Sequence, residues 1–181
     1  MFRIIMCFLY YCNLHFQVDR LDLVYDIIHA NPAIRFNDIM RLSKLKNGTL
    51  THYITKLEDD KKINAERSPR ISRFYDVTIT PDQAHICKYL TRPTLKNIIA
   101  LLLEKGTLTL PEIRNQIQKS SATISVCLND LFKQNIITKT YDIPSNKYSL
   151  KDPEFIQLVI KTHFQDSLSK LIDNKSMLVD I

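Results

Sequence analysis

The strongest constraint on the fold is an internal repeat with a period of 74 residues. When the chain is aligned with itself at this shift, apolar positions coincide without a gap, although few residues are identical. Residues 35–65 then lie on residues 109–139, and the matched pairs include Ile39 with Ile113, Leu50 with Ile124, Ile54 with Leu128, Leu57 with Leu131 and Ile63 with Ile137. Because apolar positions determine which face of an element is buried, the repeat predicts two copies of one small fold.

Each copy predicts a helix, a short strand, two further helices and a β-hairpin. The first helix covers residues 19–30 in copy one and residues 93–105 in copy two, with Thr91 as its N-cap and Gly106 as its stop. Ser120 is expected to cap the third helix of copy two. Two alternating runs around a polar turn end each copy and predict the hairpin. The predicted class is therefore α+β, mainly α with small β-hairpins.

At this level the chain resembles a known family. The segment "NPAIRFNDIMRLSKLKNGTLTHYITKLEDDKKINAERSPRISRFY" is similar to the winged helix-turn-helix of MarR- and ArsR-type regulators. Over residues 19–150 the chain resembles archaeal transcriptional regulators with two such domains in tandem, more closely in copy one than in copy two. The resemblance implies a first winged helix (19–80), a connecting helix or linker (81–92) and a second winged helix (93–151). Outside it lie an apolar N-terminal extension (1–18) and a C-terminal amphipathic helix with a tail (152–181).

The charge distribution favours nucleic acid as the partner. The chain has a net charge of +6, and nine basic but only four acidic side chains lie between Arg41 and Arg73. In winged helix-turn-helix domains the third helix enters the major groove of double-stranded DNA, and its N-terminal residues meet bases and phosphates. The resemblance implies that Arg-rich hairpin residues contact the backbone or the minor groove. The expected DNA-binding residues are Lys46, Asn47, Gly48, Thr49, Thr51, His52, Lys56, Arg67, Arg70 and Arg73.

Two alternatives stay open from the sequence. Copy two has a third helix without basic residues in its first turns and a hairpin tip with only Lys147 as a cation, so it binds DNA weakly, binds a partner or supports copy one. A supporting role is favoured. The rival interpretation of the whole chain is a protein-interaction scaffold of tandem winged helices, as in chromosome-condensing complexes or basal transcription factors. A positive face on copy one favours DNA, and an apolar groove there favours the scaffold.

Other functional classes find little support. The chain has two glycines, no phosphate-binding loop and no catalytic motif, so we expect no enzyme and no cofactor. Its four cysteines form no CxxC pair, and we expect reduced thiols and no metal site. The apolar run at residues 4–12 is shorter than the ~20 residues of a membrane-spanning helix. We therefore expect a cytoplasmic protein.

The segment between the two copies (81–92) and the C-terminal segment (152–181) bear on how the domains are held together. Pro81 is placed at the start of a helix, and too few flexible residues follow it for a free linker, which predicts a rigid joint. The tail is amphipathic, with an apolar face that packs on its own domain or forms a homodimer. That face consists of Phe155, Ile156, Val159, Ile160, Phe164, Leu168, Leu171 and Ile172.

Overall fold

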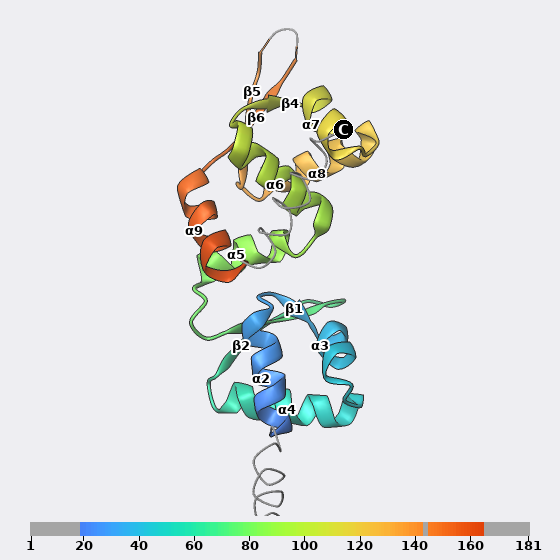
Figure 1. Ribbon diagram of the computed structural model, residues 1–181, viewed down its shortest axis with the longest axis vertical. Coiled ribbons are helices and arrows are strands. Elements are labelled where there is room, and N and C mark those ends of the chain that lie inside the picture. Colours follow the sequence, from blue (N-terminus) through green and yellow to red (C-terminus); the bar gives the residue numbers. More distant parts are fainter. Residues whose placement is uncertain (1–18, 143–144, 165–181) are drawn as a thin grey trace, which may run out of the picture. The chain divides into compact units, whose positions relative to one another are not determined.

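The computed structural model describes residues 19–142 and 145–164, and the expectations for residues 1–18 and 165–181 lie outside these ranges. The described chain forms two units, one ending at Ile79 and the other beginning at Thr80 (Figure 1). Both are mainly helical, and each contains a three-stranded antiparallel sheet. The predicted class, mainly α with small β-hairpins, is confirmed.

Unit 1 has the order helix, strand, helix, helix, hairpin, which is that of a winged helix-turn-helix. Its helix α2 begins where the Asp19 carboxylate accepts a hydrogen bond from the Leu21 N–H, and it ends at Asn31. Lys44, in the left-handed region with φ of 56°, allows the tight connection between the second and third helices. The elements are α2 (Arg20–Ala30), β1 (Ile34–Arg35), α3 (Phe36–Ser43), α4 (Asn47–Asp59), β2 (Ile63–Arg67) and β3 (Ser72–Asp76).

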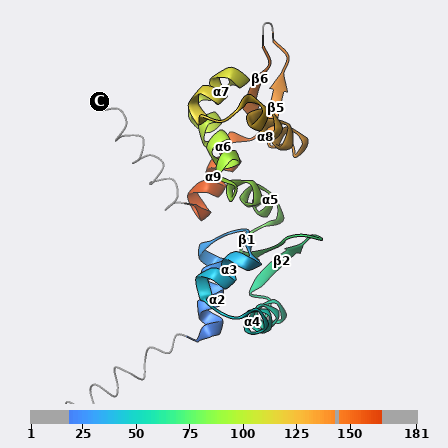
Figure 2. The same ribbon diagram turned by 90° about the vertical axis from the view of Figure 1, so that its right-hand side faces the viewer.

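The core of unit 1 lies between its three helices and the sheet. Helix α4 buries Leu50, Ile54 and Leu57, which recur at helical spacing and form one stripe. Helix α2 buries Val24 and Ile28 and contacts both α3 and α4. The third helix is thus fixed by its apolar face, and its opposite face is left to solvent. Figure 2 shows the hairpin of β2 and β3 extending past these helices.

Unit 2 repeats this order between an additional helix at each end. The strand β1 and the helices α3 and α4 begin 74 residues before β4, α7 and α8. The strand orders also correspond, β1-β3-β2 and β4-β6-β5. The elements are α5 (Pro81–Leu90), α6 (Pro93–Lys105), β4 (Leu108–Thr109), α7 (Leu110–Ile117), α8 (Ser121–Lys133), β5 (Ile137–Thr140), β6 (Lys147–Leu150) and α9 (Pro153–His163).

The ends of these helices agree with the sequence except at one cap. Gly106 ends α6 with a φ of 75°, and Ser120 caps α8 by accepting a hydrogen bond from the Thr123 N–H, as predicted. Thr91 was predicted to cap α6, and this is wrong. Thr91 instead ends α5, donating its hydroxyl to the Lys88 carbonyl, because Arg92 occupies the N-cap position before Pro93.

The two ends of unit 2 are helical. Helix α5 lies within the predicted connecting segment, and Thr80 and Gln83 form a capping box before and after Pro81. Helix α9 buries Ile156, Val159 and Ile160 and contacts α5. The described part of the C-terminal helix therefore packs within its own unit, while Leu168, Leu171 and Ile172 lie outside the described residues. In the part of the chain that the structure describes, no helix is both long and apolar enough to cross a membrane.

Candidate nucleic-acid interface

The solvent face of α4 carries most of the predicted site. The exposed residues on it are Lys46, Asn47, Gly48, Thr51, His52 and Lys56, and Thr49 is half-buried. All large apolar side chains of this helix except the half-buried Tyr53 are in the core. The structure thus brings seven of the ten predicted residues onto or beside one face, with Thr49 at its edge.

The N-terminal end of α4 has no side-chain cap. Lys46 occupies the N-cap position, and its side chain makes no capping hydrogen bond. Thr51 turns inward along the helix, donating its hydroxyl to the Asn47 carbonyl over 2.9 Å. Uncapped N–H donors and the helix dipole together attract an anion at this end.

Gly48, the second residue of α4, is not required by packing. A Cβ atom built there meets no heavy atom within 4 Å, and its φ is not in the left-handed region. Glycine at this position lowers helix stability by up to about 1 kcal/mol relative to alanine. Packing within the described protein therefore does not require a glycine at this position.

The tip of the first hairpin holds one unpaired arginine. Ser68 and Ile71 exchange backbone hydrogen bonds of 3.0 and 3.3 Å and close a turn with Pro69 and Arg70 at its tip. Arg70 is exposed, and no ion pair within the described residues engages it. The hairpin of β2 and β3, called the wing below, therefore presents the Arg70 guanidinium to solvent.

Arg67 lies at the base of the turn and is partly neutralised. Its Nη2 atom donates to Glu58 Oε2 on α4 over 2.6 Å, and the side chain is 58% exposed. The bond to Glu58 raises the pKa of Arg67, so the guanidinium remains charged. This pair ties the hairpin of β2 and β3 to the end of α4.

Arg73, which the sequence placed among the expected DNA-binding residues, does not lie at the hairpin tip. It lies in the central strand β3, paired with Glu66 on one side and Arg35 on the other, and it is 5% exposed. Its Nη1 atom donates to the Ala33 carbonyl over 3.0 Å. Ala33 has a φ of 62°, which L-residues adopt at a cost of about 1–2 kcal/mol, and Arg73 stabilises this turn. Arg73 is thus buried in the sheet, and little of its side chain is open to a ligand.

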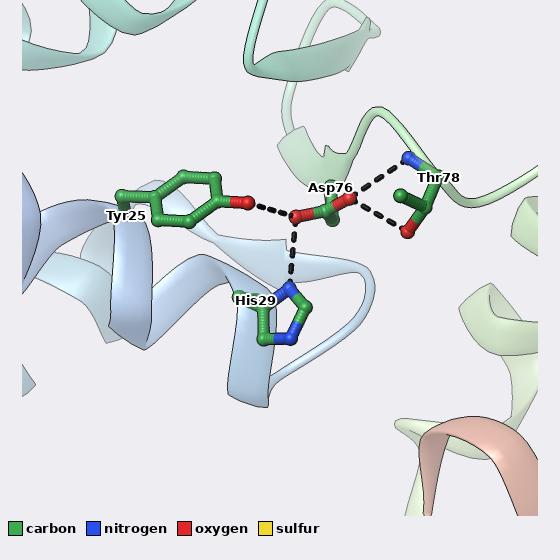
Figure 3. A network of polar contacts seen from close by, with 4 residues as sticks. All are labelled: Tyr25, His29, Asp76 and Thr78. Atoms are coloured by element: carbon green, nitrogen blue, oxygen red, sulfur yellow. Dashed lines mark hydrogen bonds and ion pairs between the residues drawn. The ribbon is translucent and has the colours of Figure 1, made fainter.

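A buried carboxylate behind the wing fixes β3 to α2. Asp76 Oδ2 accepts hydrogen bonds from the Tyr25 hydroxyl and from His29 Nδ1, each over 2.8 Å (Figure 3). Its Oδ1 atom accepts from the Thr78 N–H and hydroxyl over 2.8 and 2.7 Å. The Tyr25 and His29 rings stack with their centroids 5.9 Å apart. Four donors thus satisfy one carboxylate at the end of the hairpin.

The electrostatics of this cluster favour the ionised carboxylate. Burial would raise the pKa of Asp76, but the hydrogen bonds from Thr78, His29 and Tyr25 outweigh it and hold the pKa well below its usual range. The bond to Asp76 raises the pKa of Tyr25. The sequence interpretation missed this cluster because its members are 47 and 51 residues apart. The only local signal was Asp-Val-Thr, a spacing at which aspartate commonly bonds its own backbone.

Metal and thiol chemistry play no visible part in the described residues. Within them, no three His, Cys, Asp or Glu side chains gather closely enough to hold a metal ion. Cys87 and Cys127 are free and buried, as expected for structural thiols. Burial raises the pKa of Cys87 to about 12 and also raises that of Cys127, so neither is a reactive thiolate.

The chain was also compared with known proteins. Neither a protein-family model nor a curated protein sequence matches this chain. The transcriptional repressor BigR from Xylella fastidiosa is similar in structure, with a TM-score of 0.41 and 27% identity over 46% of this chain and 86% of BigR. The homodimeric winged helix-turn-helix DNA-binding domain of a Mycobacterium bovis protein has a TM-score of 0.39 and 18% identity, over 53% of this chain and 82% of that domain. Because both scores are below 0.5, we infer function from the residues of the interface.

Proposed function

We propose that this protein is a sequence-specific, double-stranded DNA-binding transcriptional regulator built from two tandem winged helix-turn-helix domains. The recognition helix is α4, which enters the major groove. The wing of unit 1 contacts the DNA backbone or the minor groove through Arg70, with Arg67 beside it. The observation that carries the proposal is the solvent face of α4, which has glycine or a polar or basic residue at every exposed position in its first three turns.

The face has the chemistry that DNA recognition needs. Asn47 and His52 offer hydrogen-bonding groups to base edges, and asparagine pairs well with adenine in the major groove. Lys46 and Lys56 flank them with positive charge, and no ion pair within the described residues engages either lysine. The uncapped helix N-terminus adds N–H donors for a phosphate.

The scaffold alternative predicts an apolar groove at this place. Within the described residues, the exposed large apolar side chains of unit 1 are Leu42, Ile71 and Val77, and none lies on α4. Protein interfaces have an apolar centre with few charges. The composition of the α4 face therefore favours DNA over a protein partner.

The proposal also covers the assembly of the protein and its place in the cell. We propose a homodimer held by the C-terminal segment, whose residues beyond Phe164 continue the apolar pattern of α9. Paired recognition helices then bind half-sites about one helical turn apart. The protein acts without a catalytic centre and without a cofactor, in the cytoplasm, as the archaeal-type regulators that it resembles.

The test measures binding to the best duplex found in the genome and to random duplex. Changing Asn47 or His52 to alanine should cost about 1–3 kcal/mol on the best site and much less on random DNA, because base contacts carry the sequence preference. Both positions are exposed, so the free energy of unfolding should be unchanged. Equal losses on both duplexes, or none, would contradict α4 as the recognition helix.

A further inference from the structure

The third helices of the two units differ at equivalent positions. Helices α4 and α8 start 74 residues apart and have the same length, 13 residues. In this register His52 of α4 corresponds to Val126 of α8, and both are exposed. Where the first helix presents an imidazole, the second presents an aliphatic side chain.

The exposure of Val126 is not explained by the packing of its unit. Helix α8 is held by Ile124, Leu128 and Leu131, which are at most 1% exposed, whereas Val126 is 70% exposed. Its neighbours on the solvent side are Ala122, Ser125 and Asn129, all exposed and uncharged. Val126 also lines an open hollow between the start of α6 and α8, together with Pro93, Leu95, Ala122 and Cys127. The polar residues Arg92, Thr94 and Thr123 line the same hollow, so a cation and hydroxyl groups lie beside the exposed valine.

Positive charge flanks the start of α8. The Arg114 guanidinium lies 3.4 Å from the Ser121 hydroxyl and 3.4 Å from the Asn115 amide oxygen, so it is positioned by neutral groups. Lys119 is exposed in the connection to α8. The two nearest carboxylates along the chain are engaged elsewhere: Glu112 accepts from Thr109, and Asp130 pairs with Arg92 over 2.8 Å.

The overall charge of unit 2 is also positive, like the surroundings of the start of α8. Residues 80–164 contain 11 basic and seven acidic side chains, against 11 and nine in residues 19–79. In unit 1, moreover, Arg73 is buried and Arg67 is paired with Glu58. Unit 2 is therefore not the poorer of the two in cations, in contrast to the impression that the hairpin sequences give.

We propose that α8 is a second recognition helix, in which Val126 contacts thymine methyl groups in the major groove. The inference rests on the DNA-binding function proposed above and extends it to unit 2. The C5-methyl of thymine is the apolar feature of the major groove, and apolar side chains select it. Arg114 and Lys119 supply the flanking phosphate contacts. The two units thus read different sequence features, hydrogen-bonding groups by α4 and methyl groups by α8.

The experiment uses the full chain and a duplex selected for tight binding. Thymines are replaced by deoxyuridine, which lacks only the methyl group, in successive segments of the site. Substitution in one segment should weaken binding by the wild type about fourfold for each methyl contacted, the equivalent of one buried methylene. Val126→Ser should weaken binding to the thymine duplex to a similar extent and should be insensitive to deoxyuridine in that segment. Leu158→Ser, at an apolar position of α9 that is 54% exposed, is the matched control and should behave like the wild type.

The outcomes separate this inference from the proposed function. Loss of binding in Asn47→Ala, together with unchanged binding in Val126→Ser and no effect of deoxyuridine, would overturn the role of α8 and leave that of α4 intact. A change in the mass in solution of Val126→Ser with unchanged DNA affinity would identify a protein contact instead and also overturn it. Failure of the wild type to bind any duplex would reject both.

Discussion

Changing Arg67, Arg70 or Arg73 of the first hairpin to alanine should affect DNA binding and stability differently. Of these arginines, only Arg70 is exposed and free of an ion pair within the described residues, as are Lys46 and Lys56 of the α4 face. If each meets one phosphate, the logarithm of the affinity falls against the logarithm of the salt concentration with a slope of about −2.7, since each contact contributes about −0.9. Affinity should then drop by a factor of about 40 between 50 and 200 mM salt, and by about 12 in Arg70→Ala.

Arg73→Ala should instead act on stability. It removes the donor to the Ala33 carbonyl from a site that is 5% exposed, and an unsatisfied buried acceptor costs about 1–3 kcal/mol. The salt slope should stay at the wild-type value. Arg67→Ala should have effects between those of Arg70→Ala and Arg73→Ala. Its loss of stability should be at most about 1 kcal/mol, because the pair with Glu58 is exposed, and its effect on the salt slope should be smaller than that of Arg70→Ala, because Glu58 already partly neutralises the guanidinium.

The assay combines fluorescence anisotropy of a labelled duplex at several salt concentrations with urea unfolding of the free protein. Lys161→Ala, an exposed cation on α9, is the control and should leave both the slope and the stability unchanged. A flatter slope with unchanged stability in Arg73→Ala, together with an unchanged slope in Arg70→Ala, would show that the hairpin residues have been assigned to the wrong roles.

Three further predictions follow from particular residues. Gly48→Ala should raise the free energy of unfolding by up to about 1 kcal/mol and weaken DNA binding, because the methyl group meets no protein atom but blocks a close approach; a more stable variant with unchanged affinity would remove the role given to the glycine. Asp76 has a folded pKa below the unfolded value of about 3.9, so its contribution to stability is complete above that pH and is lost as the pH falls further. In acid titrations followed by circular dichroism, Asp76→Asn should be less stable at pH 7 and lose less stability below pH 4, whereas a parallel loss would contradict this. Truncation after Phe164 should shift the mass in solution from dimer to monomer with both units folded; a wild type that is already monomeric would exclude the proposed dimer.

The sequence predicted the helices of this fold well because their information is local and repeated. Leu50 and Ile124 occupy equivalent buried positions 74 residues apart, and two weak patterns that coincide are stronger than one. The cap at Ser120 was likewise predicted, since a cap needs only a short polar side chain beside the first turn. The choice of Phe164 as the truncation site depends on the structure. Ile156 and Val159 on α9 are buried and α9 contacts α5, so a cut before α9 would remove part of the core of unit 2, and the sequence does not show this contact.

The hairpin was harder to predict because its register depends on long-range pairing. The run "RSPRISR" placed three arginines near one turn, but the turn closes between Ser68 and Ile71. Arg73 therefore already lies inside β3, between Glu66 and Arg35, and faces the turn at Ala33. A shift of one residue in a strand exchanges its two faces, and no local pattern distinguishes a buried arginine from a phosphate-binding one.

The central claim is that α4 of unit 1 recognises a specific DNA sequence. In vitro selection from a randomised duplex library with the full-length protein tests it most directly, with the Asn47→Ala, His52→Ala double variant selected in parallel. We expect the wild type to enrich one motif and the double variant to lose the bases that α4 contacts while still binding duplex at low salt. A wild type that enriches no sequence over the starting library, or a double variant that enriches the same motif as strongly, would contradict the claim.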